Sequence, residues 1–246
     1  FDGTEINYIV NKGKEPWLIF IHGGGSNHTV WKPFFSYFKR HSFIAVDIRG
    51  HGKSEKGKIS CKNFSKDLKK IFDKEKIEKA VILGNSFGAT IAIDFYRKFP
   101  GLVEKLVLIT PVSTKIIRFS KLFYLLNKII LPFVKLFKSR RRLVFQDYYK
   151  FKIRFVIRSL WLDIKGTSLT MYLSSIDALF NYDLRFENIQ KKTLMILGKK
   201  DYLTKKQKIK KMIKNNNNII LRIIDSNHLP LTRAPEKVIK EVKKFI

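Results

Sequence analysis

Five consecutive residues have the pattern that exposes a reactive serine. Residues 84–88 read GNSFG, follow the apolar run at 80–83 and precede a helical pattern at 89–99. A sharp turn from strand to helix strains the central residue, and the flanking glycines relieve the crowding. Ser86 would stand at the helix N-terminus, where the helix dipole favours a developing negative charge. The motif in this context predicts that Ser86 is a nucleophile.

A serine hydroxyl needs a neighbouring base to remove its proton. His228 follows the apolar run 219–224, so a loop at the carboxyl end of that strand would reach the same edge of the sheet as Ser86. The other four histidines all precede the serine motif: His22, His28, His41 and His51. A histidine in a surface loop would be the alternative if His228 stood alone. Because the serine motif is also present, we interpret His228 as the general base.

A third group, normally a carboxylate, must orient the imidazole and stabilise its protonated form. Asp201 follows the predicted strand 193–197, again at a carboxyl end. The competing Asp225 lies only three residues before His228 and at the end of the same strand, which makes a hydrogen bond back to that imidazole less natural. The sequence therefore favours Asp201.

A negatively charged oxygen formed in the reaction needs two backbone N–H donors, one of them from the residue after the nucleophile. Phe87 supplies that donor. Residues 22–25 read HGGG and follow the apolar run 17–21, so we predict the second donor at Gly24. A glycine-rich phosphate cradle is the rival interpretation, but neither G-x-x-x-x-G-K-[ST] nor G-x-G-x-x-G occurs. We interpret His22 as bracing this loop.

These residues require a scaffold that brings strand ends together. Short apolar runs at 17–21, 43–48, 80–83 and 105–109 alternate with amphipathic helical patterns, and the alternation resumes after residue 190. Runs of this kind are typical of strands buried on both faces of a parallel sheet. The predicted fold class is α/β, with a mostly parallel central sheet and helices on both faces. Residues 1–110 and 189–246 would form this core.

The interval 111–188 interrupts the alternation and is predicted to be an inserted helical cap. Residues 112–162 contain thirteen Lys or Arg and one acid, Asp147. The whole chain carries a formal net charge of +30. Such a charge is expected to attract polyanions, although 38 of the 50 basic residues are Lys and a lysine-rich composition offers an alternative explanation.

Two polyanionic partners come into question. The segment 115–137 mixes basic and apolar residues and precedes Arg140, Arg141 and Arg142, so the cap is expected to contact an anionic membrane. We expect no specific nucleic acid as partner, because no nucleic-acid-binding module is recognisable.

Cysteine content and apolar run lengths place limits on the compartment. Cys61 is the only cysteine, which excludes an intrachain disulfide and a cysteine-based zinc site. A reducing compartment follows, and we expect a cytoplasmic protein, peripheral at the membrane if the cap binds lipid. No apolar run reaches the roughly 18 to 20 residues that span a bilayer.

The chain resembles the α/β-hydrolase fold superfamily in the order of these motifs. The resemblance rests on HGGG at 22–25, DIRGHGKS at 47–54, GNSFG at 84–88, GKKD at 198–201 and HLP at 228–230. Relatives usually have Gly where this chain has Asn227. The resemblance implies a serine hydrolase with the triad Ser86, Asp201 and His228, which needs no metal or organic cofactor.

The substrate that the resemblance implies is a small carboxylic ester. The aromatic and apolar cap predicts an apolar acyl or lipid-like group. Thioesterases, peptidases and carbon–carbon bond hydrolases share the scaffold and remain alternatives, and a non-catalytic binding protein is a further one.

Overall fold

The computed structural model describes residues 2–136, 145–148, 163 and 166–246. The segment that holds Arg140, Arg141 and Arg142 therefore lies outside the described residues. Within the described part of the chain, no helix is both long enough and apolar enough to cross a membrane.

A seven-stranded sheet forms the centre of the protein, in the order β1-β3-β2-β4-β5-β6-β7. Only β1 runs antiparallel to its neighbour, and every other pair is parallel. The strands are β1 (Tyr8–Asn11), β2 (Lys14–Ile21), β3 (His41–Val46), β4 (Ala80–Asn85), β5 (Val103–Ile109), β6 (Thr193–Gly198) and β7 (Ile219–Ile224). The predicted α/β class with a mostly parallel sheet is confirmed.

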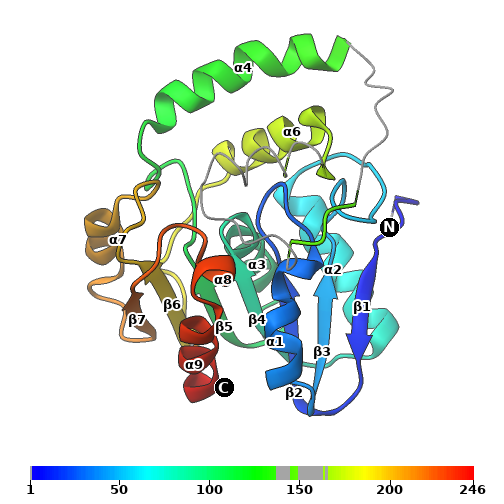
Figure 1. Cartoon of the computed structure of the whole chain (residues 1–246), viewed down its shortest axis with the longest axis vertical. Helices are drawn as coiled ribbons and strands as arrows, with labels where there is room; N and C mark the ends of the chain where they lie inside the picture. Colours follow the sequence, from blue (N-terminus) through cyan, green and yellow to red (C-terminus); the bar gives the residue numbers. More distant parts are fainter. Residues whose placement is uncertain (1, 137–144, 149–162, 164–165) are drawn as a thin grey trace.

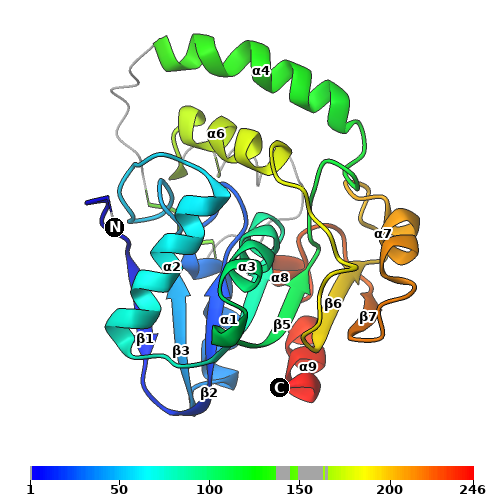
Figure 2. The same ribbon diagram turned by 180° about the vertical axis from the view of Figure 1, so that it is seen from behind.

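Helices cover both faces of this sheet. In Figure 1 the face toward the viewer carries α1 (Lys32–Tyr37), α8 (Pro230–Arg233) and α9 (Pro235–Phe245). Figure 2 shows α2 (Cys61–Glu75) and α3 (Phe87–Lys98) on the opposite face. Helix α7 (Lys206–Ile213) lies beside β6 and β7, and two short 3-10 helices, His28–Trp31 and Pro100–Leu102, complete the core.

The side chains of the central strands pack into two hydrophobic cores, one on each face of the sheet. In β2, Leu18 and Phe20 pack with the aromatic cluster around Trp31, whereas Ile19 and Ile21 pack on the other face with residues such as Phe64 of α2. Successive strand side chains point to opposite faces, so a strand buried on both sides must be apolar at every position. This explains why the sequence shows continuous apolar runs.

Two helices of the interval 111–188 lie above the carboxyl ends of the parallel strands (Figure 1). They are α4 (Ser120–Leu136) and α6 (Leu169–Phe180), and they pack against each other. Below them, the Asn27 amide donates to the Gln146 carbonyl at 2.7 Å, and the Tyr148 N–H donates to Thr29 Oγ1 at 2.9 Å. The interval is thus tied directly to the loop after β2.

Candidate active site

Ser86 lies in a strained turn between β4 and α3. Its φ is +51°, in the left-handed region of the backbone that residues other than glycine rarely adopt. A Cβ at Gly84 would lie 2.4 Å from the Gly88 carbonyl oxygen, and one at Gly88 would lie 2.3 Å from the Ile21 carbonyl oxygen. The two glycines therefore let β4, α3 and β2 approach one another closely enough to form the turn, which leaves Ser86 partly exposed.

A continuous hydrogen-bonded chain joins Ser86, His228 and Asp201. Ser86 Oγ is 3.1 Å from His228 Nε2, and His228 Nδ1 is 2.9 Å from Asp201 Oδ2. A carboxylate can only accept, so Nδ1 carries the proton and Nε2 presents its lone pair to the serine. The imidazole is thus in the tautomer that can receive the serine proton.

Asp201 is buried and held by four donors. His228 and the Thr204 hydroxyl donate to Oδ2, and the N–H groups of Leu203 and Thr204 donate to Oδ1. Burial alone would raise the pKa of Asp201, but the hydrogen bond and charge of His228, with the bonds from Thr204 and Leu203, lower it overall. Asp201 therefore remains ionised at neutral pH. Sequence reasoning missed Thr204, which a hydroxyl residue three positions after the acid could have suggested.

The competing Asp225 does not contact the imidazole. Its carboxylate is exposed and lies 3.1 Å from Lys200 Nζ, which lowers its pKa. Asn227, the departure from the usual glycine, has its side-chain oxygen 2.9 Å from the Leu229 N–H. This hydrogen bond joins the two neighbours of His228 and so fixes the backbone turn around it.

The loop after β2 lies beside Ser86. A Cβ at Gly23 would be 3.3 Å from Ser86 Cβ, and one at Gly24 would be 3.8 Å from Phe87 Cβ. Phe87 is the first residue of α3, so its N–H has no acceptor inside the helix. Gly24 and Phe87 therefore lie next to each other, beside Ser86.

His22 braces this loop with both ring nitrogens. Nδ1 is 2.7 Å from the Gly23 carbonyl oxygen, and Nε2 accepts from the Ile48 N–H at 3.1 Å. These bonds define a neutral imidazole with its proton on Nδ1. Burial lowers the pKa of His22 to about 4, in keeping with the neutral form.

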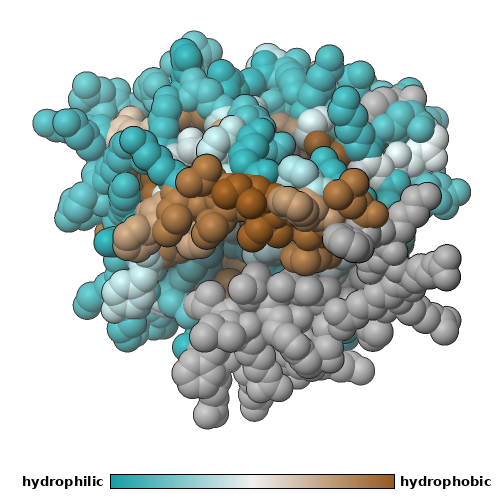
Figure 3. Space-filling model, turned by 90° about the horizontal axis from the view of Figure 1, so that it is seen from above, coloured by the Kyte–Doolittle hydropathy of each residue, from teal (hydrophilic) through white to brown (hydrophobic). Residues whose placement is uncertain are grey.

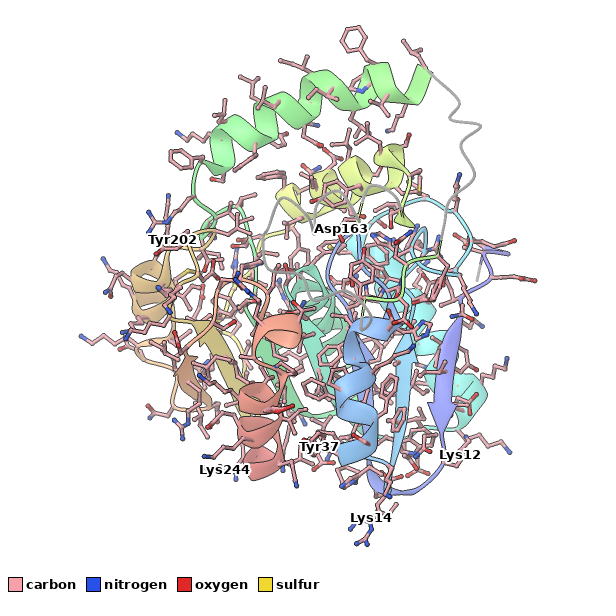
Figure 4. The ribbon with its side chains drawn as sticks, in the orientation of Figure 1. Lys12, Lys14, Tyr37, Asp163, Tyr202 and Lys244 are labelled. Carbon is pink, nitrogen blue, oxygen red and sulfur yellow. The ribbon has the colours of Figure 1, made fainter. Side chains whose placement is uncertain are left out.

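Three side chains of the interval 111–188 hold the same loop from above. Tyr148 Oη and Thr167 Oγ1 donate to the Gly25 carbonyl at 2.9 and 3.2 Å, and Tyr148 Oη is 2.6 Å from Asp163 Oδ1. A Cβ at Gly25, whose φ is +79°, would lie 2.5 Å from Asp163 Cβ. Figure 4 shows Asp163 beneath α6, at the top of the sheet. No sequence motif pointed to these residues.

Tyr148 Oη contacts two oxygen atoms, the Gly25 carbonyl oxygen and Asp163 Oδ1, so the protonation of Asp163 decides which of them accepts the phenol proton. Burial raises the pKa of Asp163 to about 7, although the hydrogen bond to Tyr148 opposes this. A phenol has one proton. When Tyr148 donates it to Gly25, the bond to Asp163 requires a protonated carboxyl as donor. Once Asp163 ionises, its carboxylate competes with the Gly25 carbonyl for the phenol proton.

The part of the chain that the structure describes contains no group of three or more His, Cys, Asp or Glu side chains that could hold a metal ion.

A family comparison identifies the class to which this arrangement belongs. The model of the alpha/beta hydrolase fold matches residues 16–234, and the chain therefore belongs to this family. An esterase from Exiguobacterium antarcticum superimposes with a TM-score of 0.77 at 20% identity, covering 99% of this chain and 96% of that structure. This likeness supports the fold.

Two curated relatives extend the comparison. A putative esterase/lipase 2 of Mycoplasma pneumoniae is 26% identical over 244 residues, which cover 93% of this chain and 88% of the relative. An uncharacterized protein of Mycobacterium tuberculosis is 35% identical over 104 residues, or 40% of this chain. That match spans about 30% of the mycobacterial protein's length. The chain is thus esterase-like by distant homology.

Proposed function

We propose that the protein is a serine hydrolase that cleaves carboxylic esters through an acyl-enzyme. The observation that carries this proposal is the chain of hydrogen bonds from Ser86 through His228 to the buried Asp201, in a turn that strains the serine backbone. A strained backbone conformation has a free-energy cost, and such residues concentrate at functional sites.

The geometry supports a two-step reaction. Ser86 Oγ attacks the ester carbonyl carbon while His228 Nε2 takes the hydroxyl proton, and Asp201 stabilises the resulting imidazolium. The carbonyl oxygen becomes negatively charged and accepts hydrogen bonds from the N–H groups of Gly24 and Phe87. The tetrahedral intermediate collapses, and His228 gives its proton to the leaving alcohol. A water molecule, deprotonated by His228, then attacks the acyl group and releases the acid and free Ser86.

The names of similar proteins and the covering helices favour esters with an apolar acyl group. The Mycoplasma relative is described as an esterase/lipase and the superimposed structure as an esterase. Helices α4 and α6 are rich in Leu, Ile and Phe and lie over the strand ends that carry the triad. The same groups could attack a thioester or an amide.

The test is hydrolysis of p-nitrophenyl esters of increasing acyl length by the parent protein and by Ser86→Ala. The variant should lose about 10⁴ to 10⁶ of the turnover, because the triad acts as a unit. Ser36→Ala, at an exposed position near the end of α1, should retain near-parental turnover. A Ser86→Ala protein that is folded by circular dichroism and still turns over at the parental rate would overturn the proposal.

A further inference from the structure

The outer side of α4 exposes a continuous apolar face. Its large apolar side chains are 43% to 78% exposed, far more than a monomer's core-facing helix would leave in water. The face comprises Leu122, Leu125, Leu126, Ile129, Ile130, Phe133 and Leu136, and Phe119 and Phe123 extend it at the start of the helix. Figure 3 shows the resulting hydrophobic band across the top of the molecule.

The inner side of α4 already has a partner. Tyr124 packs edge-on against Phe180 of α6 with ring centroids 5.4 Å apart, and Leu131 is buried. Residues 124, 127, 131 and 134 follow the three-and-four spacing of one helical face. The exposed set lies around the remainder of the helix, so packing on α6 cannot bury it.

A row of lysines follows one edge of the exposed face. Lys121, Lys128 and Lys135 are seven residues apart, which places them on one side of the helix, and all three are exposed. Lys128 lies 3.6 Å from Asp177 of α6, and the seven-residue spacing places Lys121 and Lys135 along the same edge of the helix. Helix α4 contains no acidic residue.

We propose that α4 lies in the surface of an anionic lipid bilayer. Its apolar face would enter the boundary between headgroups and acyl chains, and its lysine row would reach the lipid phosphates. A second copy of the chain is a poorer occupant, because it would oppose two lysine rows on molecules of net charge +30 each. An anionic surface complements both features at once.

This placement would bring the top of the sheet toward the bilayer, since α4 lies above the carboxyl ends of the strands (Figure 1). The inference goes beyond the proposed hydrolase function, because lipid binding by α4 requires neither Ser86 nor any ester substrate. The binding measurements below can therefore be made on Ser86→Ala protein as well, with the same expected result.

The first experiment measures co-sedimentation with vesicles of phosphatidylcholine and phosphatidylglycerol, and with phosphatidylcholine alone. The parent should bind the anionic vesicles and lose binding as salt is raised. The double variant Lys121→Gln/Lys135→Gln should bind about 30-fold more weakly, at about fivefold for each charge near the surface. The matched control Lys240→Gln/Lys244→Gln on α9, at the opposite end of the molecule, should bind like the parent (Figure 4).

The apolar contribution has its own pair of variants. Leu122→Ser/Phe133→Ser should weaken vesicle binding by at least about tenfold while leaving the melting temperature unchanged, because both side chains are already exposed. Val10→Ser/Ile220→Ser replaces two exposed apolar side chains on the edge strands β1 and β7 and should leave binding intact.

The second experiment locates the inserted segment with a fluorophore. Cys61 is buried and its thiol pKa is raised to about 12 by that burial, so it is a poor target for labelling. An environment-sensitive dye on Ile129→Cys in α4 should brighten and shift to the blue on anionic vesicles. The same dye on Lys244→Cys in α9 should not respond.

Three results would overturn the proposal. The first is a parent that does not bind anionic vesicles. The second is an equal loss of binding from the α4 and α9 lysine variants, which would assign the attraction to net charge alone. The third is a dimer in sedimentation velocity, without lipid, that Leu122→Ser/Phe133→Ser dissociates, because α4 would then be covered by a second copy.

Discussion

Replacing Asp201 by Asn tests the hydrogen-bond logic of the site. Asp201 Oδ1 accepts the N–H groups of Leu203 and Thr204 at 2.8 and 3.2 Å, and backbone donors cannot reverse their role. The amide oxygen of Asn must therefore take this position, which places its NH₂ group opposite His228 Nδ1. The Thr204 hydroxyl can turn and accept from that NH₂ group, so the new side chain fits.

The cost of this substitution arises at the other end of the imidazole. Facing a donor, His228 Nδ1 must become the acceptor, and the ring proton moves to Nε2, 3.1 Å from Ser86 Oγ. An Nε2 that carries a proton cannot accept the serine proton. A triad locked in this tautomer loses about 10⁴ in turnover, equivalent to about 5.5 kcal/mol of transition-state stabilisation. The assay is steady-state hydrolysis of a p-nitrophenyl ester, with circular dichroism to confirm folding.

Asp225→Asn is the matched control for this substitution. Asp225 lies three residues from His228 but pairs with Lys200 at the surface, and a surface pair contributes about 0 to 1 kcal/mol. We expect turnover within about threefold of the parent. The reasoning would be refuted if Asp201→Asn retained turnover within tenfold of the parent, or if the two variants lost activity equally.

Three further substitutions test the scaffold. Gly88→Ala should unfold the turn or abolish activity, measured by thermal melting and ester hydrolysis, because its Cβ would lie 2.3 Å from a backbone oxygen; a variant with parental stability and activity would contradict this. Asn127 is buried without a hydrogen-bond partner among the described residues, so Asn127→Leu should raise the free energy of unfolding by about 1 to 2 kcal/mol in urea titration, and a loss would argue against it. In the unfolded chain Asp163 releases its proton near pH 4, and in the folded protein it does so near pH 7. The stability that the protonated carboxyl contributes should therefore fall by up to about 4 kcal/mol between these two pH values and then stay constant. Asp163→Asn should accordingly gain stability over the parent between pH 5 and pH 8, and a pH-independent difference would show that the carboxyl is not protonated in the folded state.

The parallel core could be predicted because each of its determinants is local in the sequence. Strands buried on both faces must be apolar at every position, and the expected runs at 17–21, 80–83 and 193–197 lie within β2, β4 and β6. Strand β1, with the sequence YIVN, was not among the expected strands. It is short, lies at the sheet edge and is only partly buried, so its hydrophobic pattern is weak.

Only those residues of the site that follow a predicted strand could be placed from the sequence. The carboxyl ends of parallel strands share one edge of the sheet, and the order of the apolar runs therefore predicts that Ser86, Asp201 and His228 lie close together. The contacts of Tyr148, Asp163 and Thr167 with Gly25 depend on how the interval 111–188 folds back over the core. They join residues more than 120 positions apart, without a motif, so local pattern could not reveal them. The catalytic roles and the boundaries of the cap stay predictions.

The most direct test of the central claim is covalent capture of the nucleophile. A fluorophosphonate reacts with a serine only when a neighbouring base activates it, and the adduct stays on the serine oxygen. After incubation of the parent protein and proteolysis, mass spectrometry should find one phosphonyl group, on the peptide that contains Ser86, and His228→Ala should remove or greatly slow the labelling. An unlabelled parent protein, or a modification on another serine that persists in Ser86→Ala, would contradict the assignment of Ser86 as the activated nucleophile.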